Sequence, residues 1–547
     1  MSDSEPIVCR YYSRLPPELW GLVVEYLPRA DQRSCLSVSA AFHGLVCPIL
    51  FSRIVIRYGI WSTQRHAHSR FTESELLLIA WRNNVAKEIL QRIARDAQFA
   101  RSVKTISVFA YQYGRRTGES DLDIETHMVI ALESLPHLQV FRWYGFKPPL
   151  SHSVLGALTR TAGSSLTELN ICGVVGTNED ASPYLAQFKN LQTLLLAGNS
   201  FHFYVSTGLG AEFNSMLTTC AQNVPDTLLH LSIWRDAVWA VSLRVLSGLQ
   251  ELSMMHPSSL AKLGLIFAHC AQLCSLSIMT VGFNCELELL TALRATQDAL
   301  PCLTSFKLVL WGEAFVADPG PFIEFFKNKK GMRRLDLQLN HLLMGDDYIR
   351  FLDVFAYLPR LEVVGLELKG AGFSREHLAL LDERLPLGLS ALLLRWSTYT
   401  FNAFESGSDI HPQNWIDMLK RRPALGYLHI LYLEHDLSLG RSLDLRARLL
   451  KDRPRALRLV GYGPQIRSIE RDPVTGESTY GPPWSDAAVT VGAVEDFGCE
   501  DWAWLAFCFA GWTPWYWLRL CVDSTPKTRL RYLLYDMNYV VWLYPIR

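Results

Sequence analysis

The strongest pattern in the sequence is a short unit, apolar-x-x-apolar-x-apolar, that recurs about twelve times between residues 102 and 460. Apolar residues separated by one position lie on the same side of a strand, so each unit predicts a short strand. Roughly 20 residues separate neighbouring units, which is enough for a helix that returns the chain to the next strand. The units begin at Val103, Leu138, Leu166, Leu191, Leu228, Leu249, Leu273, Leu303, Met332, Leu361, Leu389 and Leu425.

Two of these units extend further and carry a resemblance to a known family. Residues 191–201 and 332–342 fit L-x-x-L-x-L-x-x-N-x-L, with Asn199 and Asn340 at the asparagine position, and this pattern resembles the leucine-rich repeat. The resemblance implies an α/β fold, a leucine-rich-repeat solenoid with parallel strands on the concave face and helices on the convex face. The uneven spacing of the units favours irregular repeats.

A helical pattern precedes the repeats. Pro16 and Pro17 suit the first turn of a helix, where a missing N–H has no partner to lose. Apolar residues follow at helical spacing, namely Leu19, Leu22, Val23, Tyr26 and Leu27. Asp31 suits the N-cap of a second helix, and residues 42–50 predict a third. Three short helices in about forty residues cannot bury this apolar surface alone, so a partner is implied.

These residues, followed by the repeats, resemble an F-box protein of the SCF ubiquitin ligases, whose F-box subunits are substrate receptors. The matching motifs lie in residues 12–53 and are Leu15-Pro16-x-Glu18-Leu19, Leu27-Pro28-x-x-Asp31, Leu36-x-Val38 and Phe42…Leu45…Phe51. Phe51 stands where the family often has Trp. The resemblance implies that a Skp-family adaptor, which bridges to a cullin, binds Leu15, Pro16, Leu19, Leu27, Leu36 and Val38. The alternative is that these residues form the core of a helical cap on the solenoid.

Residues 54–101 are expected to form a linker that contains one long helix. Thr72 and Glu75 have the spacing of a capping box, and helical periodicity runs from there to about Ala100. Apolar positions such as Ile79, Ala86 and Leu90 suit a helix that locks the F-box to the first repeat. A rigid connection would hold a target at a set place.

The residue after the second apolar position of each strand is expected to face the concave side. In four consecutive units this residue is Trp234, Met255, Met279 and Val309. Strands lie about 4.8 Å apart, so these side chains predict a nearly continuous stripe. Exposed Trp and Met are typical of binding surfaces, which makes this stripe the expected target-binding site. The alternative is that another part of the chain covers it.

Residues 461–547 are the candidate cover, because the repeat fades there and 7 of the 16 Trp residues follow. Turn signals within residues 471–477 predict a loop or hairpin around them. The Trp-rich part could cap the end of the solenoid, lie across the concave face, or present a target pocket. Its uncharged stretch, residues 502–518, is shorter than the ~20 residues that a spanning helix needs, so we expect a buried or docking segment.

The charge balance limits the expected classes of partner, and the cysteine content indicates the compartment. The 53 Lys and Arg balance 53 Asp and Glu, so neither nucleic acid nor an anionic membrane surface is an expected partner. Twelve Cys are scattered through apolar runs, which is typical of buried thiols in a reducing compartment. We therefore expect a protein of the cytoplasm, the nucleus or both.

The candidate catalytic and cofactor-binding motifs in the sequence are incomplete. His269, Cys270 and Cys274 lack a second matched pair of zinc ligands, and Gly208 and Gly210 lack the third glycine of a dinucleotide fingerprint. The basic runs 327–334 and 420–422 are interpreted as solvated turns, and the alternative is a role in nuclear import or in binding an acidic partner. We expect a non-catalytic substrate-recognition subunit without metal or cofactor. The alternatives are a leucine-rich-repeat scaffold without a ligase role, and an enzyme with a pocket in residues 461–547.

Overall fold

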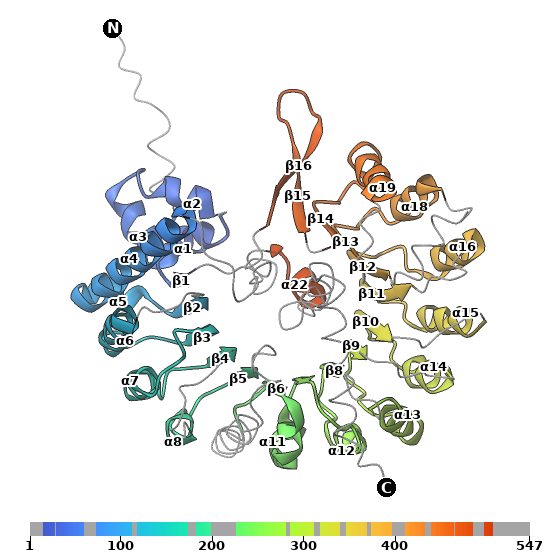
Figure 1. Ribbon diagram of the computed structural model, residues 1–547, viewed down its shortest axis with the longest axis horizontal. Helices are drawn as coiled ribbons and strands as arrows, with labels where there is room; N and C mark the ends of the chain where they lie inside the picture. Colours follow the sequence, from blue (N-terminus) through green and yellow to red (C-terminus); the bar gives the residue numbers. More distant parts are fainter. Residues whose placement is uncertain are drawn as a thin grey trace, which may run out of the picture. The chain divides into compact units, whose positions relative to one another are not determined.

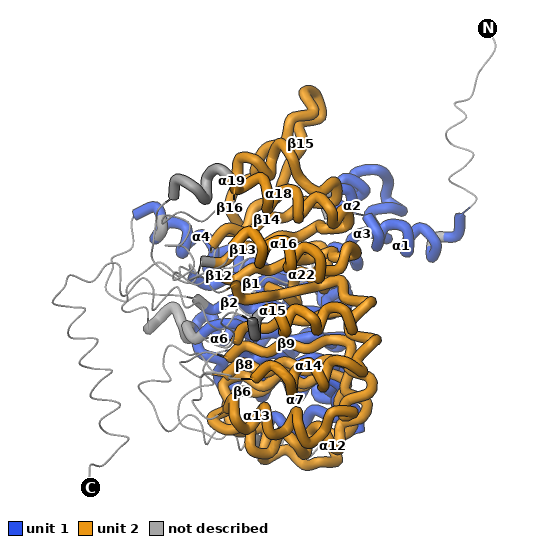
Figure 2. The backbone as a smooth tube through the Cα atoms, turned by 90° about the vertical axis from the view of Figure 1, so that its right-hand side faces the viewer, with its two compact units in different colours: residues 1–60, 70–199, 205–230 blue, residues 61–69, 200–204, 231–547 orange. Residues whose placement is uncertain are grey.

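The computed structural model describes residues 15–27, 29–59, 73–111, 118–172, 182–197, 226–280, 285–310, 318–339, 346–368, 374–396, 411–432, 439–463, 465–484 and 497–506. The chain divides into two compact units (Figure 2). Unit 1 contains Met1–Ile60, Arg70–Asn199 and Val205–His230, and unit 2 contains Trp61–Ser69, Ser200–Tyr204 and Leu231–Arg547. The division therefore falls inside the predicted repeat region and not at a predicted domain boundary.

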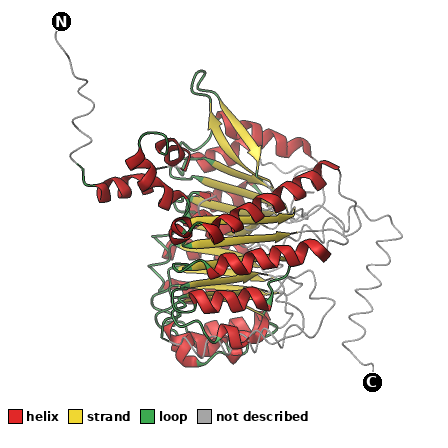
Figure 3. Ribbon diagram, turned by 90° about the vertical axis from the view of Figure 1, so that its left-hand side faces the viewer, coloured by secondary structure: helices red, strands yellow, loops and turns green. Residues whose placement is uncertain are grey.

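Unit 1 starts with three short helices, α1 (Pro17–Glu25), α2 (Arg29–Cys35) and α3 (Ala40–Leu50). Parallel strands then follow in sequence order, with helices packed along them (Figure 3). The strands are β1 (Arg53–Gly59), β2 (Thr105–Tyr111), β3 (Val140–Lys147), β4 (Glu168–Cys172) and β5 (Thr193–Ala197). The helices are α4 (Glu73–Arg95), α5 (Ala97–Ser102), α6 (Gly118–Glu133), α7 (His152–Ala162) and α8 (Ser182–Leu185).

The predicted linker 54–101 contains a strand as well as the expected helix. Ile54, Ile56 and Tyr58 alternate with exposed residues and are buried in β1, which pairs in parallel with β2. Helix α4 contributes Leu90 and Ile93 to the core. Strand β1 and helix α4 are therefore organised like one repeat, which precedes the first predicted unit at Val103.

Unit 2 continues the alternation of strand and helix. Its strands are β6 (His230–Trp234, which begins at the boundary residue), β7 (Glu251–Met255), β8 (Ser275–Thr280), β9 (Ser305–Leu310), β10 (Arg334–Leu339), β11 (Val363–Leu368), β12 (Ala391–Trp396), β13 (Tyr427–Tyr432) and β14 (Leu459–Tyr462). Between them lie η2 (Arg235–Ala240), α11 (Leu243–Gly248), α12 (Leu263–His269), α13 (Cys285–Ala295), α14 (Gly320–Lys327), α15 (Asp346–Leu352), η3 (Asp353–Tyr357), α16 (Arg375–Arg384), α18 (Pro412–Lys420) and α19 (Leu439–Lys451).

The pairing in unit 2 changes direction near its end. Strands β7 to β14 pair in parallel and in sequence order. Strand β15 (Gln465–Arg471) then pairs antiparallel with β14, and β16 (Ser478–Pro483) pairs antiparallel with β15. The turn signals in residues 471–477 thus lie at the tip of a hairpin, and α22 (Glu500–Ala506) follows.

The structure confirms the predicted fold class, an α/β leucine-rich-repeat solenoid. In each of the twelve predicted units a strand begins two residues after the unit's first apolar residue. These strands are β2 to β13, in order. In unit 2 the strands line the concave side and the helices lie on the convex side (Figure 1). We call the sheet face turned away from these helices the inner face.

Candidate functional site

Helices α1, α2 and α3 close around a small apolar core of their own. Val24, Val46 and Leu50 are buried in this core. Trp20 of α1 meets Phe42 of α3 edge to face, with ring centroids 5.4 Å apart. The residues packed partly buried around the core are Leu27, Cys35, Leu36, Phe42, Ile49 and Phe51. The three helices therefore share a core that buries one side of α1.

A second side of α1 is apolar and faces solvent. The exposed large apolar residues in and beside the three helices are Leu15, Leu19, Leu22, Val23, Tyr26 and Val38, which are between 42% and 89% exposed. Four of the five residues of the predicted helical stripe, Leu19, Leu22, Val23 and Tyr26, are therefore exposed and are here called the outer stripe, whereas the fifth, Leu27, packs partly buried against the core. A contiguous exposed apolar patch on a folded protein marks an interaction site.

The six predicted adaptor-binding residues fall into two groups. Leu15, Pro16, Leu19 and Val38 are exposed, as a docking role requires. Leu27 and Leu36 are instead half-buried against the core around Val24, because they hold the three helices together. Adaptor binding by these residues stays a prediction, and the structure adds Leu22 and Tyr26 to the exposed surface.

The three helices join the repeats through a short connection in unit 1. The Ser52 carbonyl, between α3 and β1, accepts hydrogen bonds from the Lys104 and Thr105 N–H groups, both at 2.8 Å. Phe51 packs against Phe99 of α5, with ring centroids 5.2 Å apart. These contacts fix the end of α3 to the first strands, as the predicted rigid connection requires.

The predicted target-binding stripe lies in register but is not open. Met255 is paired with Met279, and Met279 with Val309, across neighbouring parallel strands. Trp234, Met255, Met279 and Val309 are nevertheless only 4%, 4%, 8% and 1% exposed. Large side chains on strands about 4.8 Å apart shield one another, and the His256 ring lies 4.6 Å from that of Trp234. The expected exposure is thus wrong, while target binding at these four residues stays a prediction.

Buried charges lie on the inner face of unit 2. Arg395 of β12 donates to both carboxylate oxygens of Asp336 on β10, at 2.6 and 2.9 Å. Lys307 of β9 lies 3.6 Å from the same carboxylate. The Arg395–Asp336 pair crosses β11 above Gly365, where a Cβ atom would lie 2.6 Å from Asp336 Cγ. A buried carboxylate is tolerated only when it is paired, and glycine provides the space for this pairing.

Two titratable groups on β11 and β13 stand beside this pair. Burial raises the pKa of Glu367 to about 7, against the opposing attraction of Arg395. Burial lowers the pKa of His429 to about 4. The Gly463 carbonyl lies 2.8 Å from His429 Nε2 and can only accept, so Nε2 carries the proton and Nδ1 accepts from the Tyr427 hydroxyl at 2.8 Å. Neutral His429 is therefore built into the face.

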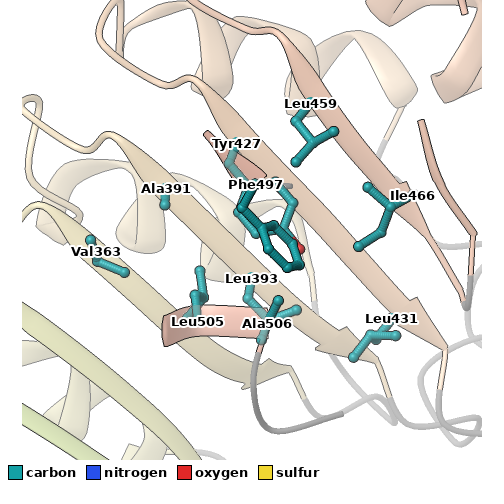
Figure 4. Packing of buried hydrophobic residues seen from close by; sticks show 10 residues of the cluster. All are labelled: Val363, Ala391, Leu393, Tyr427, Leu431, Leu459, Ile466, Phe497, Leu505 and Ala506. Atoms are coloured by element: carbon teal, nitrogen blue, oxygen red, sulfur yellow. The ribbon is translucent and has the colours of Figure 1, made fainter. Parts of the chain in front are cut away.

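Residues 497–506, here called the inner segment, pack on the inner face of unit 2. Figure 4 shows Leu505 and Ala506 of α22 close to Leu393. The Trp502 ring lies over Gly426, where a Cβ atom would come within 2.5 Å of the indole. The buried cluster contains Val363, Ala391, Leu393, Tyr427, Leu431, Leu459, Ile466, Phe497, Leu505 and Ala506. Of the three expected roles for the Trp-rich region, the described part takes the position across the concave face.

The inner segment also makes charged contacts with the sheet. Arg333 donates to Asp501 at 2.6 Å, and Arg334 donates to Glu500 at 3.0 Å. Lys307 Nζ donates to the Trp504 carbonyl and lies 4.4 Å from the centre of the Trp504 ring. A cation over an indole face is attracted by the ring quadrupole. The segment therefore presents its acidic start to a basic part of the sheet.

These contacts correct the interpretation of the basic runs as solvated turns in part, because Arg334 and Arg422 are buried. The exposed basic residues of the two runs are Lys327, Lys330, Arg333, Lys420 and Arg421. Arg333 and Arg334 pair with the inner segment, as described above. Arg422 of the second run is fully buried. Its guanidinium donates to the Asp382 carboxylate at 2.8 Å and to the Leu385 carbonyl at 3.0 Å, across neighbouring repeats. The local charge pattern could not reveal these partners, which lie tens of residues or more away in sequence.

The candidate thiols take structural positions. Cys270 is buried and Cys274 is half-buried, and burial raises the pKa of Cys270 to about 11. In the part of the chain that the structure describes, no three His, Cys, Asp or Glu side chains gather as metal ligands would. Within the same residues, no helix has the length and apolar character to cross a membrane. The candidates Gly208 and Gly210 lie outside the described residues.

No family model matches the sequence, and no curated protein matches it. The fold is similar to a chain of the Rad7 and Elc1 complex in yeast, at 13% sequence identity and a TM-score of 0.32, over 71% of this chain and 93% of that one. It is also similar to a Bacteroides fragilis protein, at 12% identity and a TM-score of 0.21, over 68% and 70%. At these TM-scores neither likeness carries an argument about function.

Proposed function

We propose that this chain is a non-catalytic substrate receptor of an SCF-type ubiquitin ligase. Helices α1 to α3 bind a Skp-family adaptor, which connects the chain to a cullin, and the repeats bind a target protein in the cytoplasm or nucleus. Ubiquitin transfer belongs to other subunits, so no catalytic residue or cofactor is proposed. The alternative is a leucine-rich-repeat scaffold without a ligase role.

The observation that carries the proposal is the outer stripe of α1. Helix α1 buries the side that carries Val24 and leaves a second apolar side exposed, which is the kind of surface that another element or a partner normally covers. Packing of Leu15, Leu19 and Leu36 into a cap would have favoured the scaffold, but Leu15 and Leu19 are exposed. These two residues also belong to the F-box-like motif, so the exposed surface and the motif point to the same partner.

The energy of adaptor binding would come from burial of the outer stripe. Burying a leucine side chain contributes about 1.5–3 kcal/mol, and central apolar anchors often dominate an interface. Replacing one anchor by a charged residue leaves that charge in an apolar contact and removes the burial. A single such change in α1 should therefore weaken binding by at least about 30-fold, which corresponds to about 2 kcal/mol.

The test measures adaptor binding by calorimetry with the full chain and two matched variants. Leu19→Asp changes the outer stripe, and Leu265→Asp changes a leucine of helix α12 with nearly the same exposure, 45% against 44%. We expect Leu19→Asp to abolish or strongly weaken binding and Leu265→Asp to leave it unchanged, with similar melting curves for both. Failure of the folded wild-type chain to bind any Skp-family adaptor would favour the scaffold.

A further inference from the structure

We propose that the inner face of unit 2, from β9 to β14, is a docking site for a helical segment with an acidic pair followed by tryptophan and leucine. The chain's own inner segment occupies this site, and a target segment of the same chemistry displaces it. This inference deepens the proposed function by naming the chemical class of the target. It rests on that function only in treating the displacing protein as a target.

The site has a basic part and an apolar part, and the inner segment matches both. Its start carries Glu500 and Asp501, which pair with Arg334 and Arg333. Its later residues are aromatic or apolar and lie on the apolar part. The sequence Glu-Asp-Trp-Ala-Trp-Leu-Ala of α22 is therefore a template for what the face recognises, since each residue type meets its complement on the sheet.

One pocket-like feature makes the site selective for an aromatic residue. Gly426 leaves no side chain between β13 and the Trp502 indole, and a Cβ atom there would come within 2.5 Å of the ring. The same indole lies 5.9 Å from the Tyr427 ring. A large flat side chain fills the space above this glycine, and large aromatic anchors of this kind carry much of the energy in protein interfaces.

The sheet keeps its charges paired when the segment leaves. Arg333 also pairs with Glu362 at 2.9 Å, Arg334 also donates to Ser305 at 2.6 Å, and Lys307 lies 3.6 Å from Asp336. Removing one partner of a buried charge is costly only when no other partner remains. Release of the inner segment therefore orphans none of the three cations, and a displacing segment of the same chemistry covers the apolar cluster again.

The sheet encloses the segment only in part. Phe497, Leu505 and Ala506 are buried, whereas the Glu500 side chain is 69% exposed and Trp502 and Trp504 are only partly buried. The twelve residues 485–496 join the segment to the hairpin. Because so few residues link it to the hairpin, the segment has an effective concentration in the millimolar range at its site. A weakly binding competitor therefore does not displace it, whereas a tightly binding one does.

The first test measures binding of a fluorescein-labelled peptide with the sequence of residues 497–506 to the full chain by fluorescence anisotropy. The opened variant carries Trp502→Ala and Trp504→Ala, and Trp81→Ala, which alters an exposed tryptophan of α4, is the control. We expect the opened variant to bind the peptide at least about tenfold more tightly than the wild type and the control, because the competing segment is weakened. Equal affinity for all three, or no binding by a folded opened variant, would overturn the proposal.

Two further measurements separate the possible outcomes. A peptide with Lys at the position of Asp501 should bind the opened variant more weakly, and Arg333→Glu in the opened variant should restore its binding. In the wild-type chain, excess peptide should accelerate hydrogen exchange of residues 500–506 and leave β12 unchanged, which tests displacement without any variant. Unaltered exchange at saturating peptide would refute displacement. Adaptor binding is measured independently, so failure here leaves the proposed function standing, and the reverse also holds.

Discussion

Replacement of Gly365 by alanine tests the buried charge pair of the inner face most directly. The new Cβ atom would lie 2.6 Å from Asp336 Cγ and closer still to Oδ1, whereas ordinary contacts at a Cβ fall between 3.4 and 4 Å. Asp336 must therefore move by about 1 Å, since tightly packed interiors absorb little extra volume. A shift of that size stretches both of its hydrogen bonds to Arg395, now 2.6 and 2.9 Å, past useful length.

The expected loss follows from what the pair contributes. Breaking a buried ion pair costs about 3–5 kcal/mol, because a charge is left without its partner. For a unit of a few hundred residues, each kcal/mol lowers the melting temperature by about 2–4 °C, so a fall of roughly 6–20 °C is expected for unit 2. Differential scanning calorimetry of the full chain is the assay, with Gly388→Ala as the control, because nothing lies within 4 Å of a Cβ at that position.

A double-mutant cycle distinguishes this cause from a general intolerance of alanine. In an Asp336→Ala background the carboxylate is gone, so the Gly365→Ala change should cost less than about 1 kcal/mol, and the two effects should be strongly non-additive. The reasoning would be refuted if Gly365→Ala melted at the same temperature as Gly388→Ala. It would equally be refuted if the cost of Gly365→Ala stayed the same with and without Asp336.

Three further predictions concern the same face. Gly426→Ala should push the Trp502 ring away and speed hydrogen exchange in α22; unchanged exchange would contradict the packing described here. Burial raises the pKa of Glu367 from its ordinary 4.5 to about 7. Protonated Glu367 therefore stabilises the fold fully below about pH 4.5, and this contribution is lost as the pH rises through 7. In Glu367→Gln the free energy of unfolding, measured in urea, should no longer fall between these pH values. Burial lowers the pKa of His429 from 6.5 to about 4, so its contribution is present above pH 6.5 and is lost as the pH falls through 4. His429→Gln should remove that acid-side loss, and a profile identical to wild type would count against neutral His429 in the folded chain.

The strands were predictable because their signal is local. Each repeat strand shows its apolar period within six residues, and the predicted positions hold from β2 to β13. Strand β1 carries the same period in Ile54, Ile56 and Tyr58, but it directly follows the F-box-like motif, and the sequence alone assigned it to a linker. Strand β14 begins at Leu459, two residues before the pattern was taken to fade, and no predicted unit was assigned to it.

The charges of the inner face were not predictable, because their partners are distant. Asp336 and Arg395 stand on two strands that are not neighbours, 59 residues apart in sequence. Each looks like an ordinary solvent-facing strand residue when its own repeat is considered alone. The one local signal was Gly365, since a glycine inside a strand often marks a close approach of another group. For helix α1 the sequence showed which residues form the apolar stripe, but helical spacing alone did not show that the stripe is exposed.

The contacts of the inner segment also set an order of events during synthesis. Lys307 and the Trp504 carbonyl that it binds are 197 residues apart, and Arg333 and Asp501 are 168 apart. At about 5–20 residues per second, the ribosome delivers Trp504 roughly 10–40 s after Lys307. During that time the strands from β9 onward emerge with their apolar inner face uncovered. Exposed apolar surface of this kind attracts chaperones and favours aggregation. Slow translation between β9 and residue 497, or a chain that ends before residue 497, should therefore increase chaperone binding and aggregation. Slow translation of the first repeats should increase them less.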